Sequence, residues 1–542
     1  MRRAPVAIAL AFSVSACGGG GAPDLILVGG RIFTADPTRP WVQALAIRGE
    51  RIVAAGPGDS VRALAGPRTR VRDLGGRTVI PGINDAHAHV APVTRGIAVR
   101  TPPQAGLREL IDSLAAVSRR YSRGAWLLAS IGDRVLDDPR ANRFFLDSVL
   151  PDDPTVLESW SGHEAILNSA ALAALGLGHD TPDPLGGRLG RARGSGNLDG
   201  RLSEYAWWAA RRRLASARAD SASRADFRAY AATAARLGIT SLQDMNNALS
   251  TARAVALVRA ADLPIRWRLI RFPMTRPGAR DLADTRERRG RPGAALDVSG
   301  TKYILDGTPV ERGALMRRPY ADRPGWRGEL NFPPDTVGAI VAEALASRDQ
   351  LLVHAVGDSA VSLVLVTLRR AAPDSTWRAL RPRIEHADFL SADLVPLARE
   401  LGAVVVQNPV HFTIPDLLRR RFGPALAATA QPLHSLLSAG IPVALGSDGP
   451  MNPYLGIMLA VTHPTNPAEA LTRVQAVTAY TRGSAYAERA ERDLGTLGPG
   501  MLADLAVLSQ DVFSVPVGDL PRTESVLTLV GGKAVWDAGV VK

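Results

Sequence analysis

Short apolar runs alternate with amphipathic segments over most of this chain. Apolar residues return at helical spacing in segments such as residues 226–237 and 337–347, and apolar runs of strand length lie between such segments. That alternation is typical of parallel β/α units. We therefore expect an α/β fold, a (β/α)8 TIM barrel with its active site at the carboxyl ends of the strands. Eight runs are predicted to be the barrel strands: residues 78–83, 238–243, 265–271, 300–305, 350–354, 383–386, 403–407 and 442–446.

Both ends of the chain carry a different pattern, in which short apolar strands are broken by Gly-Gly and Pro. The sequence LVGGR begins at Leu27 and LVGGK begins at Leu529, and each is predicted to be a strand followed by a hairpin-type turn. We predict a small β-sandwich built from residues 24–76 and 490–542, around a barrel domain at residues 77–489. Chance similarity of two hairpins is the alternative.

The interval from about residue 97 to residue 224 is too long for a single β/α connection. It is therefore predicted to be an insertion after the first barrel strand, placed over the barrel mouth. Its sequence GGRLGRARG contains three arginines on a Gly-rich stretch, Arg188, Arg191 and Arg193. One hypothesis is a lid whose arginines attract anionic or acyl groups, and the alternative is a solvated loop.

Composition favours a large globular protein. The chain has 542 residues, of which 46% are hydrophobic, enough for a sizeable core. Its net charge of +13 could suggest a nucleic-acid partner, but the 65 Lys and Arg are spread along the chain without a basic run interleaved with aromatic residues. We predict no nucleic-acid partner and a solvated, Arg-rich surface.

The first residues resemble a bacterial lipoprotein signal. Arg2 and Arg3 precede an apolar run that is too short to span a bilayer and ends in VSAC, followed by GGGGAP. This pattern resembles a lipobox and implies a signal peptide at residues 1–16, lipid attachment at Cys17 and a tether at residues 17–23. We expect anchoring in the outer membrane, facing the periplasm. A buried structural cysteine is the alternative.

Ligand-type side chains lie at the ends of several predicted strands. The sequence INDAHAHV presents two imidazoles two residues apart, which share one face of a strand. Each position alone has an ordinary explanation as a turn or a capped strand. Together, on strands that converge at one barrel mouth, they predict a metal site made of His87, His89, Lys302, His354, His386 and Asp448.

Five segments that contain these residues resemble the successive motifs of the amidohydrolase superfamily: PGINDAHAH, KYILDG, LLVHAVGD, RIEHADF and ALGSDGP. Further segments resemble its family 3 branch, which includes N-substituted formamide deformylase-like proteins: SGHEAILNSAALAALGL, PLGGRLGR, GITSLQDM, VVVQNPVHF and LGTLGPGMLADLAVL. The resemblance runs from about Asp24 to the carboxyl terminus. It implies a TIM barrel with a flanking β-sandwich and one or two divalent metal ions, with zinc expected.

The resemblance assigns one metal ion to His87, His89 and Asp448, and a second to His354 and His386. Relatives carry a lysine that reacts with carbon dioxide, and the resulting carbamate bridges the two metal ions.

Lys302 matches that lysine. A carbamate supplies the oxygen ligands that a free ammonium lacks. If Lys302 stays unmodified, we expect a single metal ion.

The implied reaction is hydrolysis of a C–N bond in an amide, N-formyl or N-acyl amine. Zinc lowers the pKa of a bound water to about 7 and polarises the substrate carbonyl. Asp448 is then expected to act as general base toward that water and as acid toward the leaving nitrogen.

Other residues are predicted to lie around the reacting groups. In the manner of the family, His163 and Asn168 in the insertion and His411 after the seventh strand are expected to contact the substrate. A capping or core histidine is the alternative for His163. Asp85 and Glu385 adjoin ligands and are expected to orient imidazoles, with ordinary surface carboxylates as the alternative.

Other functions stay open at this point. A D-aminoacylase-like, carbamate or ester hydrolase would use the same scaffold, whereas a heterocycle deaminase usually lacks the bridging lysine. A non-catalytic, surface-anchored binding lipoprotein is the alternative from another class. The expected partners are a small amide-type substrate and a membrane reached through the lipid anchor, and a homodimer is left open.

Overall fold

The computed structural model describes residues 21–90, 96–102 and 104–542. The predicted signal peptide and Cys17 lie outside these residues. Within the described part of the chain, no helix has both the length and the apolar character needed to cross a membrane.

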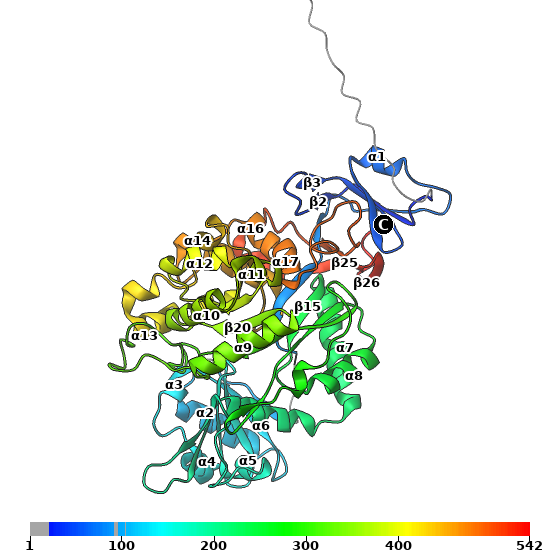
Figure 1. The fold of residues 1–542 in the computed structure, drawn as a ribbon. Coiled ribbons are helices and arrows are strands. Elements are labelled where there is room, and N and C mark those ends of the chain that lie inside the picture. Colours follow the sequence, from blue (N-terminus) through cyan, green and yellow to red (C-terminus); the bar gives the residue numbers. More distant parts are fainter. Residues whose placement is uncertain (1–20, 91–95, 103) are drawn as a thin grey trace, which may run out of the picture.

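A barrel of eight parallel strands forms the centre of the molecule (Figure 1). Each strand pairs with the next along the chain, and the expected (β/α)8 barrel is confirmed. The first and last strands meet where the Asp448 N–H donates to the His87 carbonyl at 2.9 Å. The barrel strands are β8 (Ile83–Ala88), β15 (Ile239–Met245), β16 (Arg266–Arg271), β19 (Leu296–Ile304), β20 (Leu351–Ala355), β21 (Arg383–His386), β22 (Val404–Gln407) and β23 (Val443–Leu445).

Helices surround the barrel because each presents an apolar stripe to it. In α10, the buried residues Val361, Val364, Leu365 and Leu368 follow the three- and four-residue spacing of one helix face. The helices that follow the insertion are α7 (Asp220–Arg236), α8 (Thr251–Ala261), α9 (Pro334–Ser347), α10 (Asp358–Ala371), α11 (Asp374–Leu380), α12 (Val395–Glu400), α13 (Pro415–Ala427), α14 (Leu433–Ser438), α15 (Pro453–Thr462), α16 (Arg473–Thr478) and α17 (Ser484–Glu488).

The first barrel strand differs from the predicted run at residues 78–83. Thr78–Pro81 forms β7, which pairs with strands from both chain ends and belongs to another sheet. Gly82 then carries the chain into the barrel, against Thr240, where a Cβ would meet the Thr240 Oγ1 at 2.0 Å. The barrel strand β8 continues through buried polar residues such as Asn84 and Asp85, so its hydrophobic signal stops before the strand does.

Two sheets built from both chain ends form a smaller unit beside the barrel (Figure 1). Residues of both sheets, including Leu27, Leu45, Val507 and Leu529, share one hydrophobic core. One sheet has the order β5-β4-β1-β6 and the other has the order β26-β25-β24-β7-β2-β3. The strands are β1 (Leu25–Val28), β4 (Ala44–Arg48), β5 (Arg51–Gly56), β6 (Arg70–Asp73), β2 (Arg31–Phe33), β3 (Trp41–Val42), β24 (Leu505–Leu508), β25 (Ser525–Val530) and β26 (Lys533–Asp537).

The two LVGG sequences have different roles. Gly531 and Gly532, with φ of 54° and 72°, make the hairpin turn between β25 and β26. Gly29 and Gly30 instead carry the chain from β1 in one sheet to β2 in the other. The prediction of a hairpin was therefore wrong for the first sequence, because its two strands find partners in separate sheets.

The chain between β8 and β15 forms a lobe with its own sheet, in the order β13-β14-β12-β11-β10-β9 (Figure 1). Its strands are β9 (Ile97–Val99), β10 (Leu127–Ile131), β11 (Thr155–Ser159), β12 (Glu164–Leu167), β13 (Gly187–Arg191) and β14 (Leu198–Glu204). Its helices are α2 (Leu107–Ser118), α3 (Asp133–Leu136), α4 (Arg143–Val149), α5 (Ser169–Ala174) and α6 (Tyr205–Ser216).

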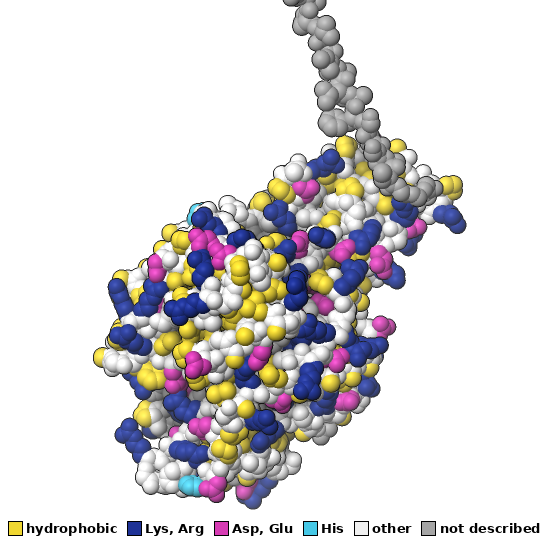
Figure 2. Space-filling view, viewed as in Figure 1, with side chains coloured by type: hydrophobic (Ala, Val, Ile, Leu, Met, Phe, Trp, Pro, Cys, Tyr) yellow, Lys and Arg dark blue, Asp and Glu magenta, His cyan; other side chains and the backbone are white. Residues whose placement is uncertain are grey.

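On the face of the molecule seen in Figure 2, Lys and Arg side chains are interspersed with acidic and hydrophobic ones. The basic residues thus show the same scatter in space on this face that they show along the sequence.

Candidate metal centre and substrate pocket

Three of the predicted ligands converge at the seam between the first and last barrel strands. The Asp448 Oδ1 lies 3.4 Å from the His89 Nε2 and 3.7 Å from the His87 Nε2. His87 is fully buried, whereas His89 and Asp448 are partly open to the cavity. These three side chains form a group that could hold a metal ion.

A second group shares the same carboxylate. The Asp448 Oδ2 lies 3.5 Å from the His411 Nε2 and 3.8 Å from the His386 Nδ1. His386, His411 and Asp448 also form a group that could hold a metal ion. The structure therefore places His411, expected to contact the substrate, beside the predicted ligands.

The remaining two predicted ligands border these groups. The Lys302 Nζ lies 2.8 Å from the His87 Nε2 in the buried barrel interior. The ring centroids of His354 and His386 lie 4.6 Å apart. The His354 Nε2 is 3.5 Å from the Gly307 carbonyl oxygen. All six predicted ligands thus lie at one barrel mouth, although neither group of candidate metal-binding residues includes His354.

Four of the site histidines have an acceptor at Nδ1. Four partners are the Glu385 carboxylate for His87 at 2.7 Å, the Met245 carbonyl for His89 at 3.0 Å, the Asn408 Oδ1 for His386 at 2.9 Å and the Asp388 carboxylate for His411 at 3.1 Å. When Nδ1 carries the proton, the lone pair of a neutral imidazole is on Nε2, where it can bind a metal ion.

Glu385 therefore orients an imidazole as expected. Asp85 has another role, because its Oδ1 accepts from the backbone N–H groups of His87 at 3.2 Å and Ser447 at 2.8 Å. It ties the two strand ends of the seam together.

Burial and neighbouring charges set the protonation of the centre. Burial lowers the pKa values of His89, His354 and His386 well below the usual range, which favours the neutral imidazoles that metal ions require. Burial would raise the pKa of Asp448, but His87 and neighbouring imidazoles outweigh it and hold this pKa well below its usual value. Burial lowers the pKa of Lys302 to about 8.

Backbone strain marks the same site. His386 and Asp448 have φ of 71° and 40°, in the left-handed region that residues other than glycine seldom adopt. Gly446, just before the strained aspartate, leaves no room for a side chain, because a Cβ would meet the His87 backbone nitrogen at 2.4 Å. The seam is therefore held in a costly conformation that aims Asp448 at the histidines.

These donors fit a divalent metal ion. Ligand atoms bound tetrahedrally to zinc at about 2.0–2.2 Å lie roughly 3.3–3.6 Å apart. The separations between the Asp448 oxygens and the Nε2 atoms of His87, His89 and His411 run from 3.4 to 3.7 Å. A borderline set of imidazole and carboxylate donors also suits zinc.

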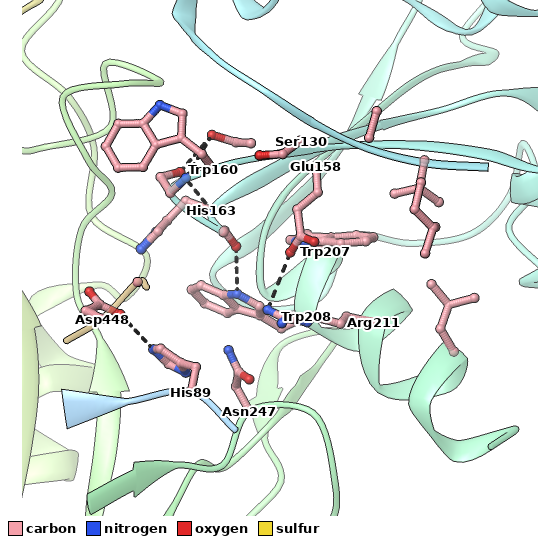
Figure 3. A pocket seen from close by; sticks show the side chains of 18 of the residues that line it. His89, Ser130, Glu158, Trp160, His163, Trp207, Trp208, Arg211, Asn247 and Asp448 are labelled. Atoms are coloured by element: carbon pink, nitrogen blue, oxygen red, sulfur yellow. Dashed lines mark hydrogen bonds and ion pairs between the residues drawn. The ribbon is translucent and has the colours of Figure 1, made fainter. Parts of the chain in front are cut away.

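A cavity of about 710 Å³ opens from the centre toward the insertion. Figure 3 shows Asp448 and His89 at one end of the view, Trp208 in the middle and Arg211 at the other end. The barrel contributes the ligand-type residues and the insertion contributes most of the remaining wall, including Glu158, Trp160, His163, Trp207, Trp208 and Arg211.

Two charged residues of the insertion wall, Arg211 and Glu158, pair with each other. Arg211 lies 3.4 Å from the Glu158 carboxylate, which also accepts from the Trp207 indole at 3.1 Å. The hypothesis of a lid made by the GGRLGRARG arginines is not supported, because Arg188 pairs with Glu329 and Arg191 donates to backbone carbonyls.

The two predicted substrate contacts of the insertion have different surroundings. His163 lies on the pocket wall, with its ring 4.7 Å from the His354 ring. Asn168 is fully buried, and its side chain caps α5 and bonds to the backbone of Leu150, Asp153 and Thr155. The structure therefore gives Asn168 a complete set of protein partners instead of a place on the pocket wall.

Sequence reasoning missed two further residues of the site. Arg383 begins the predicted strand at residues 383–386 but is not among the predicted site residues; it is fully buried and binds Glu385. Glu204 ends a strand of the insertion and bonds to His163. The bond between Glu204 and His163 depends on the fold, whereas Arg383 and Glu385 lie two positions apart on one strand, a spacing that already puts their side chains on the same face.

Comparisons with known proteins agree with this geometry. The amidohydrolase family profile matches residues 70–536. The protein LONG AFTER FAR-RED 3 of Arabidopsis thaliana is 30% identical over 95% of this chain and 91% of its own. An N-substituted formamide deformylase of Arthrobacter pascens is 27% identical over 94% and 97%. An uncharacterized metal-dependent hydrolase from Pyrococcus horikoshii has a similar fold, with a TM-score of 0.70 at 22% identity over 91% and 99%.

Proposed function

Because the chain belongs to the amidohydrolase family, and is a metal-dependent hydrolase of carbon–nitrogen bonds other than peptide bonds, we propose that it cleaves an amide, N-formyl or N-acyl amine. The observation that carries the proposal is the convergence of His87, His89 and Asp448 at the mouth of a cavity of about 710 Å³. The similarity to an N-substituted formamide deformylase favours a small amide over a polymer.

The proposed metal positions follow the donor groups. His87, His89 and Asp448 would hold one ion, and His354 and His386 would hold a second, with His411 as a further ligand candidate beside Asp448. A divalent metal ion, when bound, polarises a carbonyl and lowers the pKa of a water molecule.

The protein's own groups then position and move the proton. Asp448 faces imidazoles with both oxygens and opens to the cavity, so its carboxylate can take a proton from water and return it to the leaving nitrogen. His163, which reaches the pocket from the insertion, would contact the scissile amide. The indole and apolar groups of the wall would exclude water and hold the substituents of the amide.

Asp448→Asn tests this role. We expect turnover to fall by at least about 100-fold, because an amide side chain cannot accept the proton. Much of the metal should remain, because the histidines are unchanged. Turnover of N-formyl and N-acyl amines, beside esters and carbamates, and metal content by mass spectrometry are the measurements.

Hydrolysis by Asp448→Asn at the wild-type rate would remove the proposed role of this carboxylate. Cleavage of esters or carbamates without amides would favour the alternative hydrolases. A fully metal-loaded wild type that cleaves nothing in the panel would contradict the proposed function.

Lys302 is the proposed site of carboxylation. Its Nζ is buried against the His87 imidazole, a position where a cationic ammonium would oppose a bound metal ion. Protein prepared with ¹³C-bicarbonate should show one carbamate resonance by NMR, which disappears in Lys302→Met. A metal-loaded wild type without that resonance would leave Lys302 as an unmodified amine.

A further inference from the structure

His163 reaches the pocket from the insertion. It lies in the turn between β11 and β12. The centroid of its ring lies 4.7 Å from that of His354 and 5.3 Å from that of Trp208, to which it is nearly perpendicular. In Figure 3 it lies between Trp160 and Trp208 on the wall near Asp448. The orientation of this ring decides which of its two nitrogen atoms faces a substrate in the pocket.

Glu204 provides that hold from behind the pocket wall. Both of its carboxylate oxygens lie 3.0 Å from the His163 Nδ1, and the side chains of the pair are only 13% and 10% exposed. The Glu204 backbone N–H also donates to the His163 carbonyl at 2.8 Å. The two residues are therefore joined through both side chain and backbone.

The pair is also fixed to the barrel. The Asn331 Nδ2 donates to the Glu204 Oε2 at 3.1 Å and to the Ile304 carbonyl at 3.2 Å. Ile304 ends β19, the strand that carries Lys302. This connection sets the position of an insertion histidine relative to a barrel strand of the candidate metal centre.

The backbone of Glu204 is strained. Its φ of 55° and ψ of −127° place it in a region that glycine readily adopts and other residues seldom do, at a cost of about 1–3 kcal/mol. Its carboxylate also lies tightly against Gly307, where a Cβ would meet the Glu204 Oε1 at 2.7 Å. A glycine would adopt this backbone conformation without strain. We therefore infer that the glutamate side chain has a function that offsets the cost of the strain.

We propose that Glu204 is a positioning residue, whose carboxylate holds the Nδ1–H of His163 so that Nε2 faces the pocket and hydrogen-bonds to the scissile amide. This inference rests on the proposed function for the contact between His163 and the substrate. The pairing of the two side chains is independent of it.

Glu204→Gln and His163→Ala, alone and combined, test the coupling. We expect Glu204→Gln to lower kcat about 10–100-fold with little change in KM, because the ring loses its orientation while the pocket keeps its shape. In the His163→Ala background the same change should cost less than about 2-fold, since the group that it positions is gone. Metal content should stay at the wild-type level throughout.

Glu164→Gln is the matched control. Glu164 is also an acid of the insertion, with its side chain 13% exposed like that of Glu204, but this side chain pairs with Arg201 instead of His163. Its substitution should leave kcat within about 2-fold. Equal losses of kcat from Glu204→Gln with and without His163, or equal losses from both glutamate variants, would overturn the proposal.

Glu204→Gly separates positioning from stability. Relief of the strained backbone should keep or raise the melting temperature, while kcat falls at least as far as in Glu204→Gln. A purely structural glutamate would instead give a lower melting temperature. A lower melting temperature with unchanged kcat would contradict the positioning role.

A spectroscopic readout does not depend on turnover. In protein with ¹⁵N-labelled histidine, the His163 signal, assigned from its loss in His163→Ala, should show the proton fixed on Nδ1. In Glu204→Gly the two tautomers should mix. The same tautomer in wild type and Glu204→Gly would overturn the inference. If the tautomer changes between these two proteins but the wild type cleaves no amide, only the proposed function fails.

Discussion

Three fully buried side chains, linked by hydrogen bonds in the order Arg383, Glu385 and His87, show how single residues orient a ligand of the candidate centre. Arg383 donates to both Glu385 oxygens at 2.7 and 3.0 Å, and to the Ala86 carbonyl at 2.8 Å. Burial alone would raise the pKa of Glu385, but Arg383 and His87 hold it at about 2. Glu385 is therefore an ionised acceptor at neutral pH and fixes the proton of His87 on Nδ1.

Glu385→Gln should weaken metal binding about 10–100-fold, as losses of groups that orient metal-binding histidines commonly do. In the variant, the amide NH₂ group must face either Arg383 or His87. Because both of these residues donate hydrogen bonds to Glu385, one of the two bonds is lost. Competition with a chromogenic chelator measures the affinity.

Glu343→Gln serves as the control for that experiment, because Glu343 lies on α9, pairs with Arg280 and is not part of the centre. Unchanged affinity in folded Glu385→Gln protein would show that the carboxylate does not orient His87.

The residue scale also shows what could be predicted for the site. The histidines, Lys302 and Asp448 follow apolar strands, and parallel strands bring their ends to one mouth, so the sequence was enough to expect their convergence. Glu204 and His163 lie 41 positions apart in the insertion, and their contact depends on how β12 and β14 pair. No periodicity in the sequence encodes such a pairing.

At the element scale, α13 joins three parts of the chain through Arg421. This fully buried guanidinium binds Asp137 of the insertion and Asp322 after β19, and it donates to the carbonyls of Pro309 and Val310. Burial would raise the pKa values of both aspartates, but Arg312 and Arg421 outweigh it and lower them from the ordinary value of 3.8. The carboxylates thus favour the folded state while they are ionised.

Arg421→Met should lower the free energy of unfolding by about 3 kcal/mol at neutral pH, the lower end for a broken buried ion pair because the aspartates are partly exposed. The folded-state pKa values are lowered, so the contribution is present above about pH 4 and is lost as pH falls through them. The difference in melting temperature between wild type and variant should therefore shrink in acid.

Arg419→Met is the control on the same helix. Arg419 is half exposed and pairs with Asp416 one turn away, so its loss should change stability by less than about 0.5 kcal/mol. A gap between Arg421→Met and wild type that stays constant from pH 7 to about pH 3 would exclude the two aspartates as its cause.

Strand prediction succeeded or failed at this scale for one physical reason. Strands β20, β22 and β23 are fully buried and read as largely apolar runs, LLVHA, VVVQ and VAL. In β8, by contrast, the buried side chains include Asn84, Asp85 and His87, and the apolar run just before it pairs elsewhere. An apolar run in the sequence indicates a strand whose side chains are buried against other apolar groups. In β8, buried side chains belong to the candidate centre, so the strand lacks such a run.

At the scale of the whole molecule, two lobes divide the pocket. The barrel supplies the ligand-type residues and the insertion supplies the indoles, His163 and the Glu158–Arg211 pair. Length alone indicated an insertion, but its six-stranded sheet and the opposed charges on the pocket wall depend on tertiary contacts. Of the arginines singled out in the sequence, Arg191 donates to carbonyls of the insertion and Arg188 pairs with Glu329, and both contacts depend on the fold.

The seam that joins β8 to the segment after β23 also bears on biosynthesis. His87 and His89 leave the ribosome early, whereas Asp448 follows about 360 residues later and completes their donor group. A nascent or prematurely terminated polypeptide thus offers a cation only part of its coordination sphere. If these three side chains hold the metal ion as proposed, its tight capture would have to await synthesis of Asp448.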